Sequence, residues 1–297
     1  MADAKSVLIW APPAFVVIWA TGFVGAKFGL PYAEPMTFLA LRFAIAAALL
    51  GVWAWVRGEY RGGARDLKGA LIVGALIHGV YLGGVFTAIS LGAGAAVSAL
   101  IVGLQPVLTA LFAGPMLGER LSGRQWLGMT LGLAGVALVV ARKAGGGEIE
   151  AFPILLCVVG LIGISYASIL QKRRQITERL AGDSAIQFAS AAIFCFVFAA
   201  MFEEFRIDWT LNFGLALTWM VVALSLGAIT LLLILIRSGE ASKTASLFFL
   251  VPGVTAVMAW AMFGETFGAI ELAGLIATMI GVRLVTRAPQ ALGKASR

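Results

Sequence analysis

Histidine and cysteine are scarce in this chain. Its 297 residues include one histidine, His78, and two cysteines, Cys157 and Cys195. Each cysteine lies inside an apolar run with no ligand-like spacing to another residue, so we expect buried free thiols and neither a zinc site nor a disulfide framework. A single histidine and carboxylates that lie only near helix ends cannot assemble a His/Glu metal pair, a buried Asp pair or a Ser/His dyad. These absences disfavour an enzyme, and we expect no cofactor.

Charged side chains are also few. They make up 12% of the residues against 61% hydrophobic residues, and the mean hydropathy is +0.97. A soluble domain of this size could not bury so much apolar surface. The net charge of +7 resides in short clusters between apolar runs, with no basic aromatic surface or recognition helix that would indicate nucleic acid as a partner. The composition is typical of an integral membrane protein, with the lipid bilayer as its surroundings.

Long apolar segments fill most of the chain. A membrane-spanning helix needs about 20 mostly apolar residues, and glycine, proline or charge separates one candidate from the next. The first segment could be a signal peptide, but Asp3 weakens the positive region and no clear cleavage site follows, so we expect it to be retained. An all-α protein is predicted, with ten spans near residues 8–29, 35–56, 69–89, 94–117, 124–141, 152–171, 184–202, 213–236, 241–263 and 268–286.

Lysine and arginine in the short loops predict the orientation. With a cytoplasmic N-terminus, the inside segments hold 16 of the 22 basic residues, and Arg42 and Arg283 fall within helices. The outside segments hold only four, namely Lys27, Arg142, Lys143 and Arg206. The sequence therefore predicts a multi-pass protein of the cell inner membrane with both termini in the cytoplasm.

An internal repeat organises the chain, because residues 95–140 recur as residues 241–286 after a shift of 146 positions. The shift superposes proline, a Gly-Glu pair and spaced glycines: Pro106 on Pro252, Gly118-Glu119 on Gly264-Glu265, Gly128 on Gly274, and Gly135 on Gly281. We expect two five-helix halves, residues 1–145 and 146–297. Since five is odd, the halves must be inverted relative to each other. A basket-like bundle around a central midplane cavity is the corresponding transporter architecture.

Several motifs carry a family resemblance. They are the run from Ile18 through Trp19 to Phe23, the helix containing Leu104-Gln105-Pro106 that leads into Gly118-Glu119, and its copy from Pro252 into Gly264-Glu265. With its two five-helix halves, the chain resembles the drug/metabolite transporter superfamily, and within it the EamA-type exporters and the ten-helix amino-acid exporters of the YddG kind. The resemblance implies alternating access and an inner-membrane exporter of amino acids or related metabolites.

Polar or ionisable groups at mid-bilayer depth are candidates for the substrate site, because their burial in a membrane is costly. His78 and Tyr81 share one helix face by their spacing. The alternative for His78 is a structural role, in which a neutral imidazole donates a hydrogen bond to a carbonyl of a neighbouring helix. For Trp19, the sequence predicts a place in the cavity wall and a role in helix packing equally well. The full set of predicted substrate-binding residues is Trp19, His78, Tyr81, Gln105, Ser165, Tyr166 and Ser225.

Two prolines and two glutamates mark the helix junctions. Pro106 and Pro252 each free a backbone carbonyl, so we expect paired kinks that act as hinges, with a fixed bend as the alternative. Glu119 and Glu265 are expected to cap or clamp the junctions. The spacings Gly25/Gly29, Gly79/Gly83 and Gly128/Gly132 predict close helix approach.

The scarcity of charged side chains at mid-membrane depth limits the class of substrate. All fifteen acidic residues lie in loops or near predicted helix ends, so no mid-membrane carboxylate is available as a proton carrier. Basic groups that would clamp phosphate are also missing at that depth, unless Arg42 faces inward. We therefore expect a small neutral or zwitterionic substrate, such as an aromatic or bulky apolar amino acid, exported without proton coupling. The alternatives are other metabolites or drugs, a membrane-embedded enzyme, and a channel. A monomer would suffice.

Overall fold

A computed structural model describes residues 4–59, 66–117, 121–174, 179–228, 230–231 and 248–286. These residues are almost entirely helical, and within these ranges the only β-type pairing is an isolated bridge between Ala33 and Ile207. The helical elements are α1 (Ala4–Gly29), α2 (Pro35–Val56), α3 (Leu67–Gly74), the π-helix η1 (Ala75–Leu82), α4 (Gly83–Ser90), α5 (Ala95–Val102), α6 (Gln105–Leu117), α7 (Gly123–Gly145), α8 (Ala151–Arg174), α9 (Leu180–Phe202), α10 (Leu211–Trp219), the π-helix η2 (Met220–Gly227), the 3-10 helix η3 (Phe248–Leu250), α13 (Val251–Phe263) and α14 (Ala269–Thr286).

Seven helical rods in the described part of the chain are long and apolar enough to cross a membrane: Pro35–Val56, Leu67–Ser90, Ala95–Met116, Gly123–Gly145, Ala151–Arg174, Leu180–Phe202 and Ala269–Thr286. Three shorter apolar helices, Pro13–Gly29, Leu211–Gly227 and Phe248–Phe263, overlap the remaining predicted spans. Residues 232–247, which include parts of two predicted spans, lie outside the described residues. The all-α prediction holds, and the number of crossings remains a prediction.

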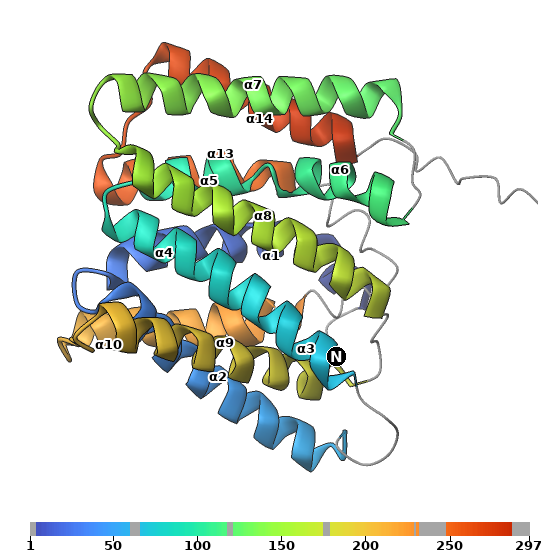
Figure 1. Cartoon of the computed structure of the whole chain (residues 1–297), viewed down its shortest axis with the longest axis vertical. Helices are drawn as coiled ribbons and strands as arrows, with labels where there is room; N and C mark the ends of the chain where they lie inside the picture. Colours follow the sequence, from blue (N-terminus) through green and yellow to red (C-terminus); the bar gives the residue numbers. More distant parts are fainter. Residues whose placement is uncertain are drawn as a thin grey trace, which may run out of the picture.

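The helices are arranged along one long axis. Figure 1 shows α7 and α14 side by side at one end of this axis and α2 and α9 together at the other, with α1, α4, α5 and α8 between them. The buried core is continuous through the middle and includes large side chains such as Phe38, Phe43, Phe86 and Phe213. The bundle therefore has two outer helix pairs that enclose a central group.

Glycines bring α7 and α14 into backbone contact. A Cβ atom placed on Gly281 would lie 2.5 Å from the carbonyl oxygen of Gly128, and one on Gly135 would lie 2.5 Å from that of Gly274. The two helices are therefore antiparallel. The 146-residue shift pairs Gly128 with Gly274 and Gly135 with Gly281, so each contact is the image of the other. The close approach predicted from the glycine spacing is confirmed for this pair.

Carboxylates cap α2 and α9 at opposite ends of their contact. Glu203, directly after α9, accepts hydrogen bonds of 2.7 Å from the backbone N–H groups of Met36 and Thr37 in the first turn of α2. At the other end, Glu59 accepts a 2.8 Å bond from the N–H of Gly182 in the first turn of α9. Free N–H groups and the positive end of the helix dipole make this position favourable for a carboxylate.

Candidate functional site

A small cavity lies where the break between α5 and α6 meets the start of α13. Its volume is about 30 Å³, which is room for a few water molecules. Four of its lining residues are among those predicted from the sequence, namely Trp19, Tyr81, Gln105 and Pro106, and Phe248 of η3 forms another part of the wall. The described helices must therefore separate before a metabolite can occupy this place.

The two prolines lie at equivalent helix starts. The helical rod 95–117 is interrupted at Gly103 and Leu104, and Pro106 is the second residue of α6. Pro252 is likewise the second residue of α13, after the 3-10 turn η3. A Cβ atom on Gly103 would lie 2.6 Å from Cγ of Pro252, so the two junctions touch. Each proline lies near the start of an α-helix, where its missing N–H leaves no hydrogen bond to replace. A hinge role for Pro106 and Pro252 remains a prediction.

Gln105 fixes the polar side of the cavity. Its Nε2 donates to Oγ1 of Thr109 at 3.2 Å and to Oγ of Ser168 at 3.1 Å. Ser165 is fully buried, and its hydroxyl donates to the carbonyl oxygen of Gln105 at 3.5 Å. Sequence reasoning missed Ser168, although its i, i+3 spacing from Ser165 places both on one helix face. Gln105 and three hydroxyls thus form one network beside the cavity.

Aromatic rings form the opposite wall. Trp19 lies with its ring centroid 5.5 Å from those of Phe15 and Phe248, the contact with Phe248 being edge to face. Phe248 was not predicted, since nothing in the sequence distinguishes it from neighbouring apolar residues. Trp19 therefore takes part in both roles that the sequence left open, cavity wall and helix packing.

His78 lies away from this cavity. Its ring packs against Phe43 and Phe188, at centroid distances of 5.6 Å and 4.5 Å, and these two rings also stack on each other. The expectation that His78 and Tyr81 share a face rests on α-helical spacing, but both belong to the π-helix η1, whose wider turn uses i→i+5 hydrogen bonds. Tyr166 is 42% exposed and is not part of the lining. A binding role for either residue remains a prediction.

Ser225 is paired with a buried arginine. Arg42 is only 4% exposed, and its Nε donates to Oγ of Ser225 at 3.2 Å. The sequence left the direction of Arg42 open, and the structure turns it inward. The only feature of the sequence that indicates this position for Arg42 is a charged residue within an apolar run.

Glu265 clamps a helix junction, as predicted. Its carboxylate accepts a 2.6 Å bond from Nζ of Lys27 and bonds of 2.9 and 3.1 Å from the N–H groups of Ala95 and Ala96 at the start of α5. Burial opposes ionisation of this carboxyl, but these hydrogen bonds outweigh burial, so its pKa is lowered. The clamp therefore stabilises the fold at neutral pH, and this contribution is lost as the pH falls through the lowered pKa. Glu119 lies outside the described residues.

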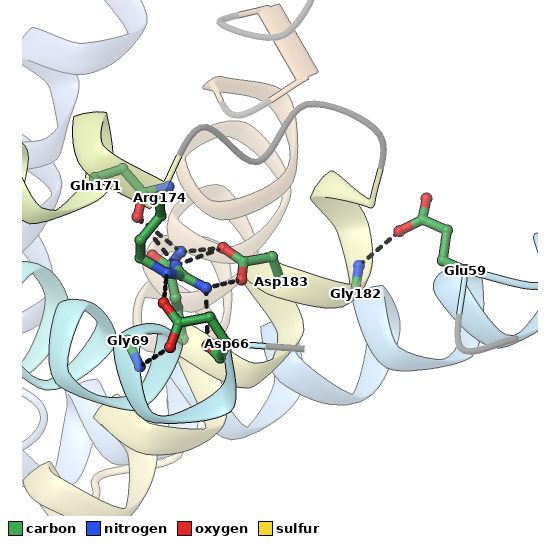
Figure 2. A network of polar contacts seen from close by, with 8 residues as sticks. Glu59, Asp66, Gly69, Gln171, Arg174, Gly182 and Asp183 are labelled. Atoms are coloured by element: carbon green, nitrogen blue, oxygen red, sulfur yellow. Dashed lines mark hydrogen bonds and ion pairs between the residues drawn. The ribbon is translucent and has the colours of Figure 1, made fainter. Parts of the chain in front are cut away.

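A second polar network joins α3, α8 and α9 (Figure 2). Arg174 lies between two carboxylates, with Nη2 2.5 Å from Oδ1 of Asp183 and Nε 2.9 Å from Oδ2 of Asp66. Gln187 also donates to Asp183, at 2.6 Å. The bond from the Gly69 N–H and the bond from Arg174 hold the pKa of Asp66 below its usual value. Within the described residues, no group of three His, Cys, Asp or Glu side chains is placed to hold a metal ion.

Comparison with known proteins gives consistent matches. The sequence model of the EamA-like transporter family matches residues 7–141 and again residues 151–287. The chain is 28% identical over 272 residues to the uncharacterized transporter YvbV of Bacillus subtilis, covering 91% of this chain and 88% of that protein. It is 24% identical over 275 residues to the uncharacterized inner membrane transporter YedA of Escherichia coli K12, covering 92% and 88%.

Another relative carries a more specific description. A probable terminal-alkyne amino-acid exporter of Streptantibioticus cattleyicolor is 25% identical over 290 residues, covering 95% of this chain and 94% of that protein. A crystal structure with 19% sequence identity superposes with a TM-score of 0.65 over 94% of this chain and 96% of its own, which indicates a shared fold. The chain therefore belongs to the EamA-like transporter family of the drug/metabolite transporter superfamily and is a multi-pass membrane transporter.

Proposed function

We propose that this transporter exports small neutral or zwitterionic metabolites, amino acids with aromatic or bulky apolar side chains included, across the inner membrane by alternating access. The observation that carries the proposal is the cavity at the break between α5 and α6, where α13 also begins, lined by aromatic rings and one amide. Such discontinuous helices form substrate sites in transporters. Relatives described as an amino-acid exporter and as an inner membrane transporter support the substrate class and the membrane.

The proposed architecture is ten membrane crossings in two inverted halves, residues 1–145 and 146–297, with both termini cytoplasmic. The two matches to the family model, which fall on either side of residue 145, support this division. The reciprocal contacts Gly128–Gly281 and Gly135–Gly274 are those expected from a two-fold axis between antiparallel equivalents. The excess of lysine and arginine in alternate loops supports the orientation.

Within this proposal, Trp19, Tyr81, Gln105 and Ser165 bind the substrate, and Pro106 and Pro252 begin the helical segments that move. Binding roles for His78, Tyr166 and Ser225 rest on the sequence alone. A drug-like apolar solute is the second candidate, favoured by the lack of a charged side chain in the cavity lining. The descriptions of the relatives as transporters favour transport over catalysis.

Flux in proteoliposomes tests the proposal. With a panel of labelled amino acids, we expect saturable efflux that follows the substrate gradient and is accelerated by substrate on the opposite side. An imposed pH gradient should drive no accumulation, because the cavity lining contains no carboxylate. Consumption of the solute would indicate an enzyme, and unsaturable voltage-driven current would indicate a channel. If a pH gradient drives accumulation that His78→Gln abolishes, His78 couples protons and this part of the proposal fails.

Two tyrosines provide a matched pair for the site. Tyr81→Ala should weaken the apparent affinity for aromatic amino acids several-fold, since a lost aromatic contact costs roughly 0.5 to 1.5 kcal/mol. Tyr166→Ala tests the role that rests on the sequence alone, because Tyr166 is 42% exposed and does not line the cavity; a value near the wild type would limit the site to the cavity lining. Concentration-dependent flux measures both. Equal losses in the two variants would place the site elsewhere.

A further inference from the structure

Arg42 is an uncommon residue in its position. It lies seven residues after the start of α2, about 10 Å along the helix at 1.5 Å per residue. Arginines near the ends of membrane helices usually extend to the interface and keep their charge in water. Arg42 is only 4% exposed, so its guanidinium stays inside the bundle. A positive charge held there requires an explanation.

Few of the described residues make a favourable electrostatic interaction with this charge. Its Nε donates to Ser225, and the guanidinium lies over the ring of Phe43 at 5.2 Å. No carboxylate of the described part of the chain forms an ion pair with it, and neither Nη atom donates a hydrogen bond there. An isolated buried ion is strongly disfavoured in a medium of low dielectric constant. Among the described residues, the terminal edge of the guanidinium therefore has no hydrogen-bond partner.

That edge of the guanidinium is not fully enclosed by the described residues. Among the described residues, the fully enclosed polar side-chain atoms without a partner are Oγ1 of Thr87 and Oγ1 of Thr255. The Nη atoms of Arg42 do not belong to this group although they have no partner among the described residues, so they are not fully enclosed. The guanidinium lies over Phe43, whose ring contacts His78 of η1, and Tyr81 of the same π-helix lines the cavity.

Ser225 orients the guanidinium. Its hydroxyl donates to the carbonyl oxygen of Met220 at 3.2 Å, so the remaining lone pairs face Arg42 Nε. Ser225 belongs to the π-helix η2, and Tyr81 belongs to η1. Such π-helical turns are frequent at functional sites because they redirect side chains. One π-helix thus holds Arg42 through Ser225, and the other carries Tyr81 of the cavity lining.

Resting on the proposed function, we propose that Arg42 binds the carboxylate of the transported solute through its two Nη atoms. Guanidinium and carboxylate are planar and match in a bidentate pair. A single carboxylate neutralises the buried charge, whereas a phosphate dianion would leave a buried negative charge. The substrates are therefore carboxylates, and the free amino acid is preferred to its amide.

The test compares acids with amides on the purified full-length chain. L-phenylalanine and L-leucine should raise the melting temperature of the wild type, whereas phenylalaninamide and leucinamide should not. Arg42→Gln should require about ten- to a hundredfold more amino acid for the same shift, the range expected for a lost charge-assisted hydrogen bond. Arg42→Lys, which keeps the charge but not the planar pair, should fall between them.

The variants without ligand separate binding from packing. Arg42→Gln should melt at or above the wild-type temperature, because it removes an uncompensated buried charge. Ser225→Ala should weaken amino-acid binding several-fold, since Arg42 loses its orientation. Arg283→Gln is the control: this arginine also lies within a helix but is exposed, and its substitution should change neither value.

Three results would overturn the inference. Equal stabilisation of the wild type by acid and amide would leave amino-acid export standing but remove the carboxylate site. Loss of stability in Arg42→Gln and Arg42→Lys without ligand, with unchanged acid-to-amide preference, would make Arg42 a packing residue. If neither acid nor amide binds and none is transported, the proposed function itself fails, and the carboxylate site with it.

Discussion

Asp183→Asn is expected to lower the free energy of unfolding by about 2 to 3 kcal/mol. The substitution removes one charge of a buried ion pair, because the side chain of Asp183 is 9% exposed and that of Arg174 is 6% exposed. A buried pair that loses one partner leaves the other charge uncompensated. Asp66 remains at 2.9 Å from Arg174, which keeps the loss at the lower end of the usual range. Chemical unfolding or thermal melting in detergent measures the change.

An exposed ion pair provides the control. Lys143 and Glu148 are 2.6 Å apart, but the side chain of Glu148 is 57% exposed. Water already solvates such a pair, so Glu148→Gln should change stability by less than about 1 kcal/mol. In the buried pair, replacing Arg174 with methionine in the Asp183→Asn background should recover part of the loss, because the buried guanidinium is then gone and the Asp66 carboxylate left behind is 52% exposed. If Asp183→Asn were as mild as Glu148→Gln, the network in Figure 2 would be solvated and would not hold the three helices together.

Gly281→Ala should destabilise the protein by about 3 kcal/mol, the upper end of the usual effect of overpacking. The added Cβ would lie 2.4 Å from the backbone nitrogen of Gly132 and 2.5 Å from the carbonyl oxygen of Gly128. Backbone atoms cannot rotate aside as a side chain can, so α7 and α14 would have to separate. The melting temperature in detergent should fall by several degrees.

A glycine in open space separates this effect from helix propensity. Gly214 lies in α10, and a Cβ atom there would meet nothing within 4 Å. Gly214→Ala should leave stability unchanged or raise it by about 0.5 to 1 kcal/mol, because alanine favours the helix. The double variant Gly128→Ala with Gly281→Ala should lose less than the sum of the two single losses, since one separation of the helices relieves both clashes. Additive losses would mean that the two glycines do not share a contact.

The sequence alone determined the class of protein. Hydropathy is a property of consecutive residues, so the apolar segments could be located before any packing was known, and the long helices lie where they were expected. The repeat is also readable along the chain, because Pro106 and Pro252, or Gly135 and Gly281, keep the same spacing. Membrane location and family followed from these linear patterns. Trp19, Tyr81, Gln105 and Pro106 could be chosen because polar, aromatic or proline residues are unusual at their depth.

Only the tertiary structure decided which of these residues meet. The direction of a side chain around a membrane helix depends on packing, and η1 changes the turn between His78 and Tyr81, so one packs against Phe188 while the other lines the cavity. Ser225 was selected for its depth, but its partner Arg42 is 183 residues away in the chain. Contacts over such separations arise when helices assemble and leave no local pattern in the sequence. This is the physical reason that the sequence could propose the members of the site but not their arrangement.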